Sequence, residues 1–268
     1  MVDIHHHLLP ALDDGSPDLA TSVEMARMAA SDGITHIVCT PHASSHWTFD
    51  PALVAARLND LRAALAAESI PLTLGVGCDF HLSYNNIEDA HANPTRYTIN
   101  AGRYLLVELP DIILAPGTGE TLHNLRADGM IPILTHPERN PTLQSSPDRL
   151  ANWLRNGLLV QVTTSSVLGE MGKEAERMAH RLLANRWVNF LATDAHNLTT
   201  RPPVMSHAHY LVAKKYGAEY ARLLCITNPT AVFENQPLPP QPEPLNLFRD
   251  EEDDNPQPWW KRLFGSRQ

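Results

Sequence analysis

The sequence predicts an α/β protein in which parallel strands alternate with helices around a barrel. Short apolar runs typical of buried strands recur along the chain, and helix-start signals such as Asp50-Pro51 and Ser146-Pro147 separate several of them. Most of these runs end in His, Asp or Glu. Because the carboxyl ends of the strands of such a barrel meet at one rim, we expect these polar residues to gather there.

The elements follow in chain order, beginning with seven strands predicted near residues 2–7, 34–39, 72–77, 104–108, 131–135, 158–163 and 187–193. Ser16-Pro17 is expected to cap the first helix, which Gly33 ends. Further helices are predicted over residues 50–67, 146–157 and 172–185. The polar stretch 81–100 is expected to be a loop with a short helix near the rim.

The length of 268 residues fits one large domain, which we place at residues 1–235. Residues 236–268 are rich in proline and acidic side chains and are expected to form a disordered tail. Its aromatic and basic end, 259–264, has the alternative interpretation of a weak anchor to a membrane surface or a partner. The net charge of −9 argues against a nucleic-acid partner.

The cytoplasm is the expected compartment. The chain shows no secretory signal and no apolar stretch near the roughly 20 residues that a bilayer requires. Cys39, Cys78 and Cys225 are widely spaced, so they indicate neither a disulfide framework nor a zinc ribbon. Thiol-based phosphatases share a cysteine that is followed six positions later by an arginine, and none of these three cysteines has an arginine at that position. Any phosphatase chemistry in this chain must therefore use metal.

Metal ligands are predicted at the strand ends. His5 and His7 are two residues apart on an extended segment, so they project from one face while His6 points the other way. Later strands add imidazoles and carboxylates, which gives the candidate ligand set His5, His7, His42, Asp79, Glu108, His136, Asp194 and His196. This set exceeds the needs of one tetrahedral zinc, so two or three divalent ions are predicted.

Mixed imidazole and carboxylate ligands suit Mn, Fe or Zn better than Ca, and Mg is a further possibility. Glu108, on a central predicted strand, is the candidate for a bridging ligand. Two adjacent cations lower the pKa of a shared water and clamp a tetrahedral phosphate. The ligand set therefore favours hydrolysis of a phosphate ester.

Three further residues are candidates for a catalytic role. Arg139 lies three residues after His136 and could present a bidentate fork to phosphate, and Arg201 is a second candidate. A surface salt bridge is the alternative for each arginine. Asp14 could orient a water or a metal-bound imidazole, or it could simply cap a turn.

A family resemblance rests on Asp3-Ile4-His5-His6-His7, Thr40-Pro41-His42, Glu108, His136-Pro137-Glu138-Arg139 and Thr193-Asp194-Ala195-His196-Asn197. Together these motifs resemble the PHP-domain phosphoesterases. They are most similar to the manganese-dependent protein-tyrosine phosphatases of bacterial capsule and exopolysaccharide gene clusters, the CpsB/YwqE group. The resemblance covers residues 2 to about 235.

The resemblance implies a distorted (β/α)7 TIM-like barrel of the PHP type with a metal cluster, most simply of manganese. It also implies a protein-tyrosine phosphatase that acts on the tyrosine cluster of an autophosphorylating kinase of capsule or exopolysaccharide synthesis. The eight candidate ligands would hold the metals, and Arg139 and Arg201 would bind phosphate. Asp79 stands where the family usually has Glu, so its metal could be reached through water or bound more weakly.

Other functions remain open at this point. A small-molecule phosphatase, for example one acting on histidinol phosphate, could use the same site. An amidohydrolase is disfavoured, because such enzymes often carry a lysine at the end of a strand. The first lysine of this chain is Lys173, which lies on a predicted helix. A metal-binding module without catalysis would hold metal but hydrolyse no phosphoester. The native metal, the substrate, the oligomeric state and the purpose of the tail do not follow from the sequence.

Overall fold

The structure, a computed structural model, describes residues 1–110 and 114–247, and the strands within them form two parallel sheets. The first sheet has the order β1-β2-β4, with the bounds Val2–His6 (β1), His36–Cys39 (β2) and Thr73–Val76 (β4). The second has the order β3-β5-β6-β7-β8-β9, with the bounds His42–Ala43 (β3), Asp79–His81 (β5), Tyr104–Glu108 (β6), Ile131–Thr135 (β7), Leu159–Thr163 (β8) and Phe190–Ala192 (β9). The protein therefore has a mixed α/β fold with parallel sheets, as predicted.

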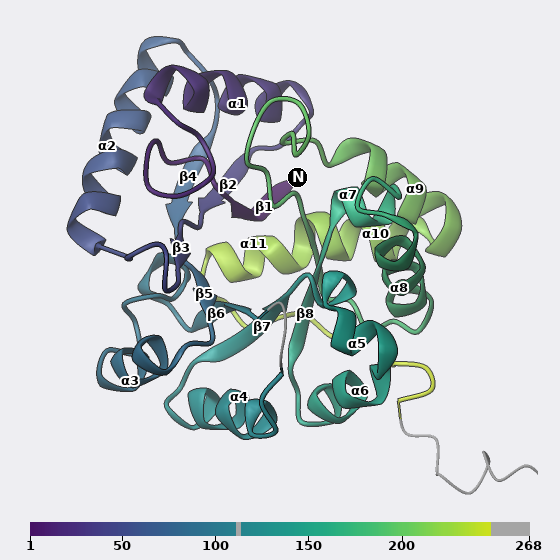
Figure 1. Ribbon diagram of the computed structural model, residues 1–268. Coiled ribbons are helices and arrows are strands. Elements are labelled where there is room, and N and C mark those ends of the chain that lie inside the picture. The colour runs from purple at the N-terminus through teal and green to yellow at the C-terminus, as the bar shows by residue number, and fades with distance from the viewer. Residues whose placement is uncertain (111–113, 248–268) are drawn as a thin grey trace, which may run out of the picture.

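Helices cover the outside of the strands, with α1 and α2 beside the first sheet and α4, α5 and α6 beside β7 and β8 (Figure 1). The α-helices are Leu19–Ser31 (α1), Pro51–Ala67 (α2), Tyr84–Ala92 (α3), Thr118–Ala127 (α4), Pro141–Ser145 (α5), Pro147–Arg155 (α6), Thr164–Val167 (α7), Lys173–Ala184 (α8), Ser206–Tyr216 (α9), Ala218–Arg222 (α10) and Asn228–Phe233 (α11). Single turns of other helix types are Ile99–Ala101 (η1), Pro137–Arg139 (η2) and Leu223–Thr227 (η3). Among the described residues, no helix is long and apolar enough to span a lipid bilayer.

The helix-start signals were only partly correct. Asp50 caps α2 as predicted, since its Oδ1 accepts a hydrogen bond from the backbone N–H of Ala52 at 2.9 Å. The first helix is capped by Asp18, which accepts from Thr21 N at 2.7 Å, so the predicted cap at Ser16 was wrong. The Ser16 hydroxyl is buried and donates to the carbonyl of Asp18 instead. The short predicted helix within 81–100 is α3, whereas α9 to α11 were not predicted.

Backbone hydrogen bonds continue across the break between the two sheets. Two residues separate β2 from β3 and two separate β4 from β5, and the first break contains Pro41, which has no N–H to donate. Across these breaks, Asp79 N donates to the Pro41 carbonyl at 3.2 Å. On the other side, Asp194 N donates to the His5 carbonyl at 2.9 Å, and His6 forms a parallel bridge with Ala195.

One apolar cluster receives side chains from both sheets and from α11. It contains Val2 and Ile4 of β1, Leu106 of β6, Phe190 of β9 and Val232 of α11, all at most 4% exposed. We call it the inner cluster. A larger cluster packs the strands against the surrounding helices. Val232 and Phe233 of α11 are both apolar and both pack in this cluster. The helix α11 therefore closes the inner cluster beside β1.

An extra residue in β1 sets the direction of the first two histidines. Asp3 pairs with Ile37 and His6 pairs with Cys39, so three steps along β1 match two steps along β2. This is the register shift of a β-bulge, which bends a strand and re-aims a side chain. Ile4 can therefore face the inner cluster while His5, the next residue, also turns inward to the site described below. Strict alternation would have placed the two on opposite faces.

The segment that follows residue 235 packs against the domain as far as the structure describes it. Trp187 Nε1 donates to the Leu245 carbonyl at 2.9 Å, and Arg155 Nε donates to the Leu247 carbonyl at 2.7 Å. Leu247 is 4% exposed and belongs to the larger apolar cluster, which packs the strands against the helices. Residues 236–247 thus differ from the predicted disorder, because their carbonyls and leucines find partners on the domain. The acidic run and the aromatic end of the predicted tail lie outside the described residues.

Candidate metal centre

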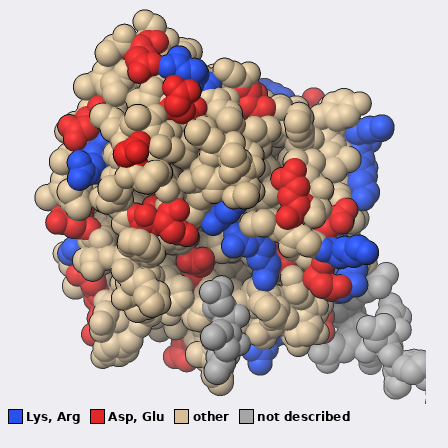
Figure 2. Space-filling model, turned by 45° about the horizontal axis from the view of Figure 1, so that its top comes forward, with Lys and Arg blue, Asp and Glu red and all other residues tan. Residues whose placement is uncertain are grey.

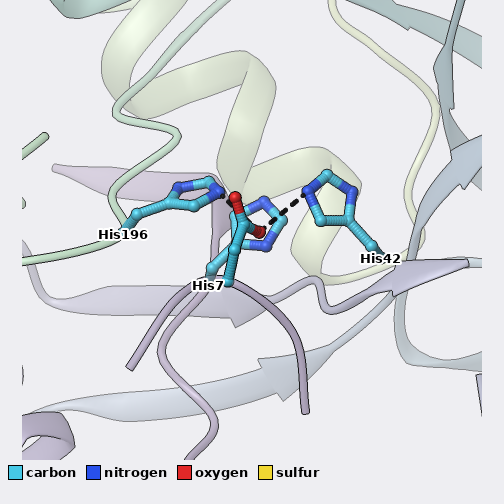
Figure 3. Close-up of side chains that lie close together, drawn as sticks. His7, His42 and His196 are labelled. Carbon is cyan, nitrogen blue, oxygen red and sulfur yellow. Dashed lines mark ion pairs between the residues drawn. The ribbon is translucent and has the colours of Figure 1, made fainter. Parts of the chain in front are cut away.

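Four polar side chains from separate parts of the chain converge beyond the end of β1. They are His7, Asp14 in the loop before α1, His42 at the start of β3, and His196 after β9, and each offers a donor atom within 4.8 Å of the others. Figure 3 shows the three imidazoles gathered around one carboxylate. Asp14 Oδ1 lies 3.3 Å from His42 Nε2 and 3.4 Å from His196 Nε2. This arrangement could hold one metal ion.

Three further groups of donor atoms adjoin the first. They are His5 with Asp79 and His136, His5 with His7 and Asp194, and His42 with Asp79 and Glu108. Because several residues belong to two groups, the donors form one continuous cluster, and all eight predicted ligands lie in it. Glu108 spans two imidazoles, since its Oε1 lies 3.6 Å from His136 Nε2 and its Oε2 lies 3.6 Å from His42 Nδ1.

The backbone is turned at the ends of two strands that contribute to the cluster. His136, directly after β7, has a φ of +32°, and Asp194, two residues after β9, has a φ of +53°. Left-handed conformations at residues other than glycine typically cost on the order of 1 kcal/mol or more and persist where the surroundings hold them. The chain therefore turns sharply at both positions, directly where these two donors leave their strands.

A buried carboxylate holds the turn at Asp194 in place. Asp3 Oδ1 accepts from the backbone N–H of Thr193 at 3.1 Å and from that of His5 at 3.3 Å, and Asp3 Oδ2 accepts from the Thr193 hydroxyl. Asp3 is fully buried. Burial raises the pKa of Asp3 to about 6, against the opposing hydrogen bonds from Thr193. Asp3 thus ties the first strand to the residue before Asp194, a role that the sequence prediction did not include.

Two other residues that were not predicted orient the imidazoles. His7 Nδ1 lies 2.7 Å from Asp13 Oδ2, and His5 Nδ1 lies 2.9 Å from Gln161 Oε1. A proton held at Nδ1 by such an acceptor leaves Nε2 free as a metal ligand. Asp13 directly precedes Asp14 in the turn Asp13-Asp14-Gly15, and the sequence analysis predicted a role only for Asp14. Gln161 stands on a predicted strand but carries no charge, so nothing in the sequence distinguishes it as part of a metal site.

Both predicted arginines meet the same carboxylate oxygen. Arg139 Nη1 lies 2.6 Å and Arg201 Nη2 lies 2.5 Å from Asp194 Oδ2. Their salt bridges are therefore with a buried residue of the cluster, not with a surface carboxylate. The loop that carries Arg139 is fixed by Glu138, which is fully buried and accepts from Thr163 N at 3.0 Å. Both guanidinium groups lie at the edge of the donor cluster.

The charges of the cluster are strongly coupled. Burial opposes the positive charge of His5, but Asp194 and Asp79 outweigh it and raise the pKa of His5 to about 9. Burial, followed by repulsion from Asp79, raises the pKa of Glu108 to about 8. For His136, burial and then the charge of Arg139 hold the pKa well below its usual range. In the metal-free protein some donors therefore carry protons that a cation would have to displace.

Several donor atoms fit a cation, because the polar atoms nearest to them are other donors of the cluster. Both carboxylate oxygens of Asp79 are buried without a hydrogen bond among the described residues, as are Nδ1 of His42 and Nε2 of His196. Asp79 Oδ2 has the imidazoles of His42 and His5 at 3.1 and 3.5 Å, and a buried carboxylate in a protein is usually paired in this way or bound to metal. A divalent cation would satisfy these lone pairs together. The residues present therefore fit a metal cluster.

Comparison with known proteins identifies the group to which this chain is related. The sequence pattern of the capsular polysaccharide synthesis family CpsB/CapC matches residues 1–234. The chain belongs to the CpsB/CapC family. Its match ends one residue before the predicted domain boundary at 235.

Relatives in the CpsB/CapC family are named as phosphatases. The chain is 34% identical over 246 residues to the tyrosine-protein phosphatase YwqE of Bacillus subtilis, covering 90% of this chain and 96% of YwqE. It is 27% identical over 242 residues to the tyrosine-protein phosphatase CpsB of Streptococcus pneumoniae, covering 88% and 99%. A crystal structure from work on YwqE and CpsB as metal-dependent tyrosine phosphatases matches with a TM-score of 0.84 and 33% identity, covering 92% of this chain and 100% of the other. These CpsB/CapC relatives favour a tyrosine phosphatase over a small-molecule phosphatase.

Proposed function

We propose that this protein is a metal-dependent phosphoric monoester hydrolase that removes phosphate from tyrosine side chains of a protein. The observation that carries this proposal is the gathering of the eight predicted metal donors in one cluster. One of these donors, Asp194, also pairs with both predicted arginines. The named activity of its CpsB/CapC relatives supports the same reaction. The substrate we propose is a phosphorylated tyrosine kinase of capsule or exopolysaccharide synthesis.

The proposed metal ligands are the eight residues predicted from the sequence, joined by Asp14. Two or three ions would suit the overlapping donor groups, and Glu108 would offer them two oxygens, one beside His42 and one beside His136. The mixture of imidazole and carboxylate suits Mn best in our proposal, with Fe, Zn or Mg as alternatives. Divalent ions held there would supply an activated water and neutralise charge on a phosphoryl group.

The protein's own groups would position the substrate. Arg139 and Arg201 share Asp194 Oδ2 as an acceptor, so their remaining N–H groups could donate to two oxygens of a phosphate. Asp14 is half exposed and lies beside His42 and His196, so it stands on the side of the cluster that an incoming water could reach. The leaving tyrosinate has a pKa near 10, so departure does not require a strong general acid.

We also propose that the two sheets together form the distorted seven-stranded barrel of the PHP type. The supporting observations are the hydrogen bonds that cross the breaks after β2 and β4, the bridge between His6 and Ala195, and the apolar cluster shared by both sheets. In such a barrel the active site lies at the carboxyl ends of the strands. The cytoplasmic location remains a prediction.

Hydrolysis of three substrates by the purified protein tests the proposal. We expect manganese-dependent release of phosphate from a phosphotyrosine peptide and from p-nitrophenyl phosphate, with a higher kcat/KM for the peptide than for histidinol phosphate. Full chelation should abolish turnover, and added manganese should restore it. Turnover that survives chelation would refute the metal mechanism, while a clear preference for histidinol phosphate would overturn the proposed substrate.

A further inference from the structure

A cavity opens beside Arg201, one of the two candidate phosphate-binding residues. It has a volume of about 170 Å³ and lies between the end of α7 and the segment 201–204. Thr193 and Arg201 belong to its lining, and Arg201 is the residue whose Nη2 reaches Asp194. The cavity therefore adjoins the site where a phosphate would bind. A protein substrate held at that site would bring residues next to its phosphotyrosine close to this opening.

The lining of the cavity combines apolar side chains with polar ones, and it includes one carboxylate. Leu168, Pro202 and Val204 are partly exposed and provide carbon surface. Glu170 also lines the cavity, is exposed, and forms no ion pair with any residue among 1–110 and 114–247. Of the basic side chains in the lining, Arg201 is paired with Asp194, and His207 forms no ion pair among the described residues. The charge of the Glu170 carboxylate is thus left for a ligand.

The surrounding surface does not neutralise the Glu170 carboxylate. Glu176 lies against Gly169, the residue before Glu170, and also makes no ion pair in the described part of the chain. Figure 2 shows a small group of basic side chains near the middle of one face, with acidic side chains on both sides of it. A substrate that crosses such a surface meets a positive centre and negative flanks.

We propose that this cavity is a specificity subsite that receives a lysine or arginine side chain close to the phosphotyrosine of the substrate. The proposal rests on the function proposed above. The aliphatic stem of the basic side chain would pack on Leu168, Pro202 and Val204, and its cationic end would meet Glu170. An acidic side chain at the same position would be repelled, and a neutral apolar one would fill the cavity without the ion pair.

Matched phosphotyrosine peptides test the subsite. They differ at a single position, scanned over the two residues on each side of phosphotyrosine, where they carry Lys, Met or Glu. Because an exposed ion pair contributes little, we expect kcat/KM for the best Lys peptide to exceed that of its Met counterpart by about 1.5- to 5-fold, with Glu lowest. Glu170→Gln should remove the difference between Lys and Met, and Glu170→Lys should reverse the order of Lys and Glu.

The controls separate this proposal from the proposed function. Glu219→Gln removes an exposed carboxylate on α10, away from the cavity, and should keep the wild-type preference. All variants should hydrolyse p-nitrophenyl phosphate at the wild-type rate, because this substrate is too small to reach the subsite. Hydrolysis without a Lys preference, or a preference unchanged in Glu170→Gln, would overturn the subsite alone. Loss of all phosphatase activity in the wild type would overturn both proposals.

Discussion

Metal binding by this protein should depend steeply on pH, because protons occupy part of the cluster when metal is absent. Burial opposes charge on His5, yet Asp194 and Asp79 raise its pKa to about 9, and burial together with Asp79 raises the pKa of Glu108 to about 8. At pH 7 both groups hold a proton. A cation that uses them as ligands must displace these protons, so raising the pH favours the metal-bound state.

The size of this effect follows from the two pKa values. The metal must displace the proton of His5, whose pKa is about 9. Between pH 7 and pH 8 this requirement raises the apparent association constant for the metal about ninefold. Displacement from Glu108 at a pKa of about 8 adds about fivefold. The product is about fiftyfold per pH unit. His42, whose pKa the Asp14 and Asp79 carboxylates raise to about 11 against the effect of burial, adds about tenfold when it is also deprotonated.

Titration calorimetry with manganese in two buffers of different ionisation enthalpy measures the protons released. We expect just under two protons at pH 7 from His5 and Glu108, and up to three when His42 contributes. Glu108→Gln cannot release its proton and should lower the count by about one, whatever its effect on affinity. Binding that releases no proton and changes less than about threefold between pH 7 and 8 would refute this reasoning.

Three further predictions concern single side chains. Gln161→Leu should raise the manganese dissociation constant about 10- to 100-fold in a metal titration, since it frees the ring of His5, whereas Gln161→Glu should retain near-normal binding; equal loss in both would contradict the orienting role. Arg139→Lys should lower kcat/KM for a phosphotyrosine peptide about 10- to 100-fold, because the bidentate fork is lost, and a change below about twofold would exclude that role. Leu247→Ala should lower the free energy of unfolding in urea by about 2–5 kcal/mol, while the half-exposed Leu245→Ala changes it by less than about 0.5 kcal/mol; similar values would show that the segment does not pack.

The strands were predictable because short apolar runs and punctuating residues are local features of the sequence. The second predicted strand illustrates the limit of this method. The strand predicted at 34–39 is β2, but the separate short strand β3 that begins at His42 was not predicted; Pro41 cannot donate to a ladder, and the hydrogen bonding passes from one sheet to the other at that point. The bulge at His5 left no local signal either, because it depends on the register with β2.

The donors of the site were predictable for a different reason. A residue such as Glu108 or His136 is an ionisable group at the end of an apolar run, which is unusual enough to recognise from the sequence alone. The residues that orient the donors have no such signature. Gln161 is identified only by its contact with His5, 156 positions away in the chain, and Asp3 only by its contacts with Thr193. Long-range hydrogen bonds of this kind depend on the folded geometry.

Asp79 links two donor groups, so its replacement should remove more metal than replacement of Asp14. Its Oδ2 lies 3.1 Å from His42 Nδ1 and 3.5 Å from His5 Nε2, which matches the spacing of roughly 3–3.5 Å between two ligands that bind one ion at about 2.1 Å. The side chain of Asp79 thus lies beside two imidazoles of the cluster. Asp14 belongs to one donor group and its side chain is 53% exposed.

Metal content measured by mass spectrometry after dialysis distinguishes the two carboxylates. Asp79→Asn should lose metal from both groups that contain it and retain at most one ion, whereas Asp14→Asn should weaken only the group formed with His7, His42 and His196. The buried position of Asp79 strengthens the contrast, because water cannot replace a ligand that is 0% exposed as readily as one at the surface. Equal metal loss in the two variants would contradict the link that Asp79 is expected to make between two donor groups.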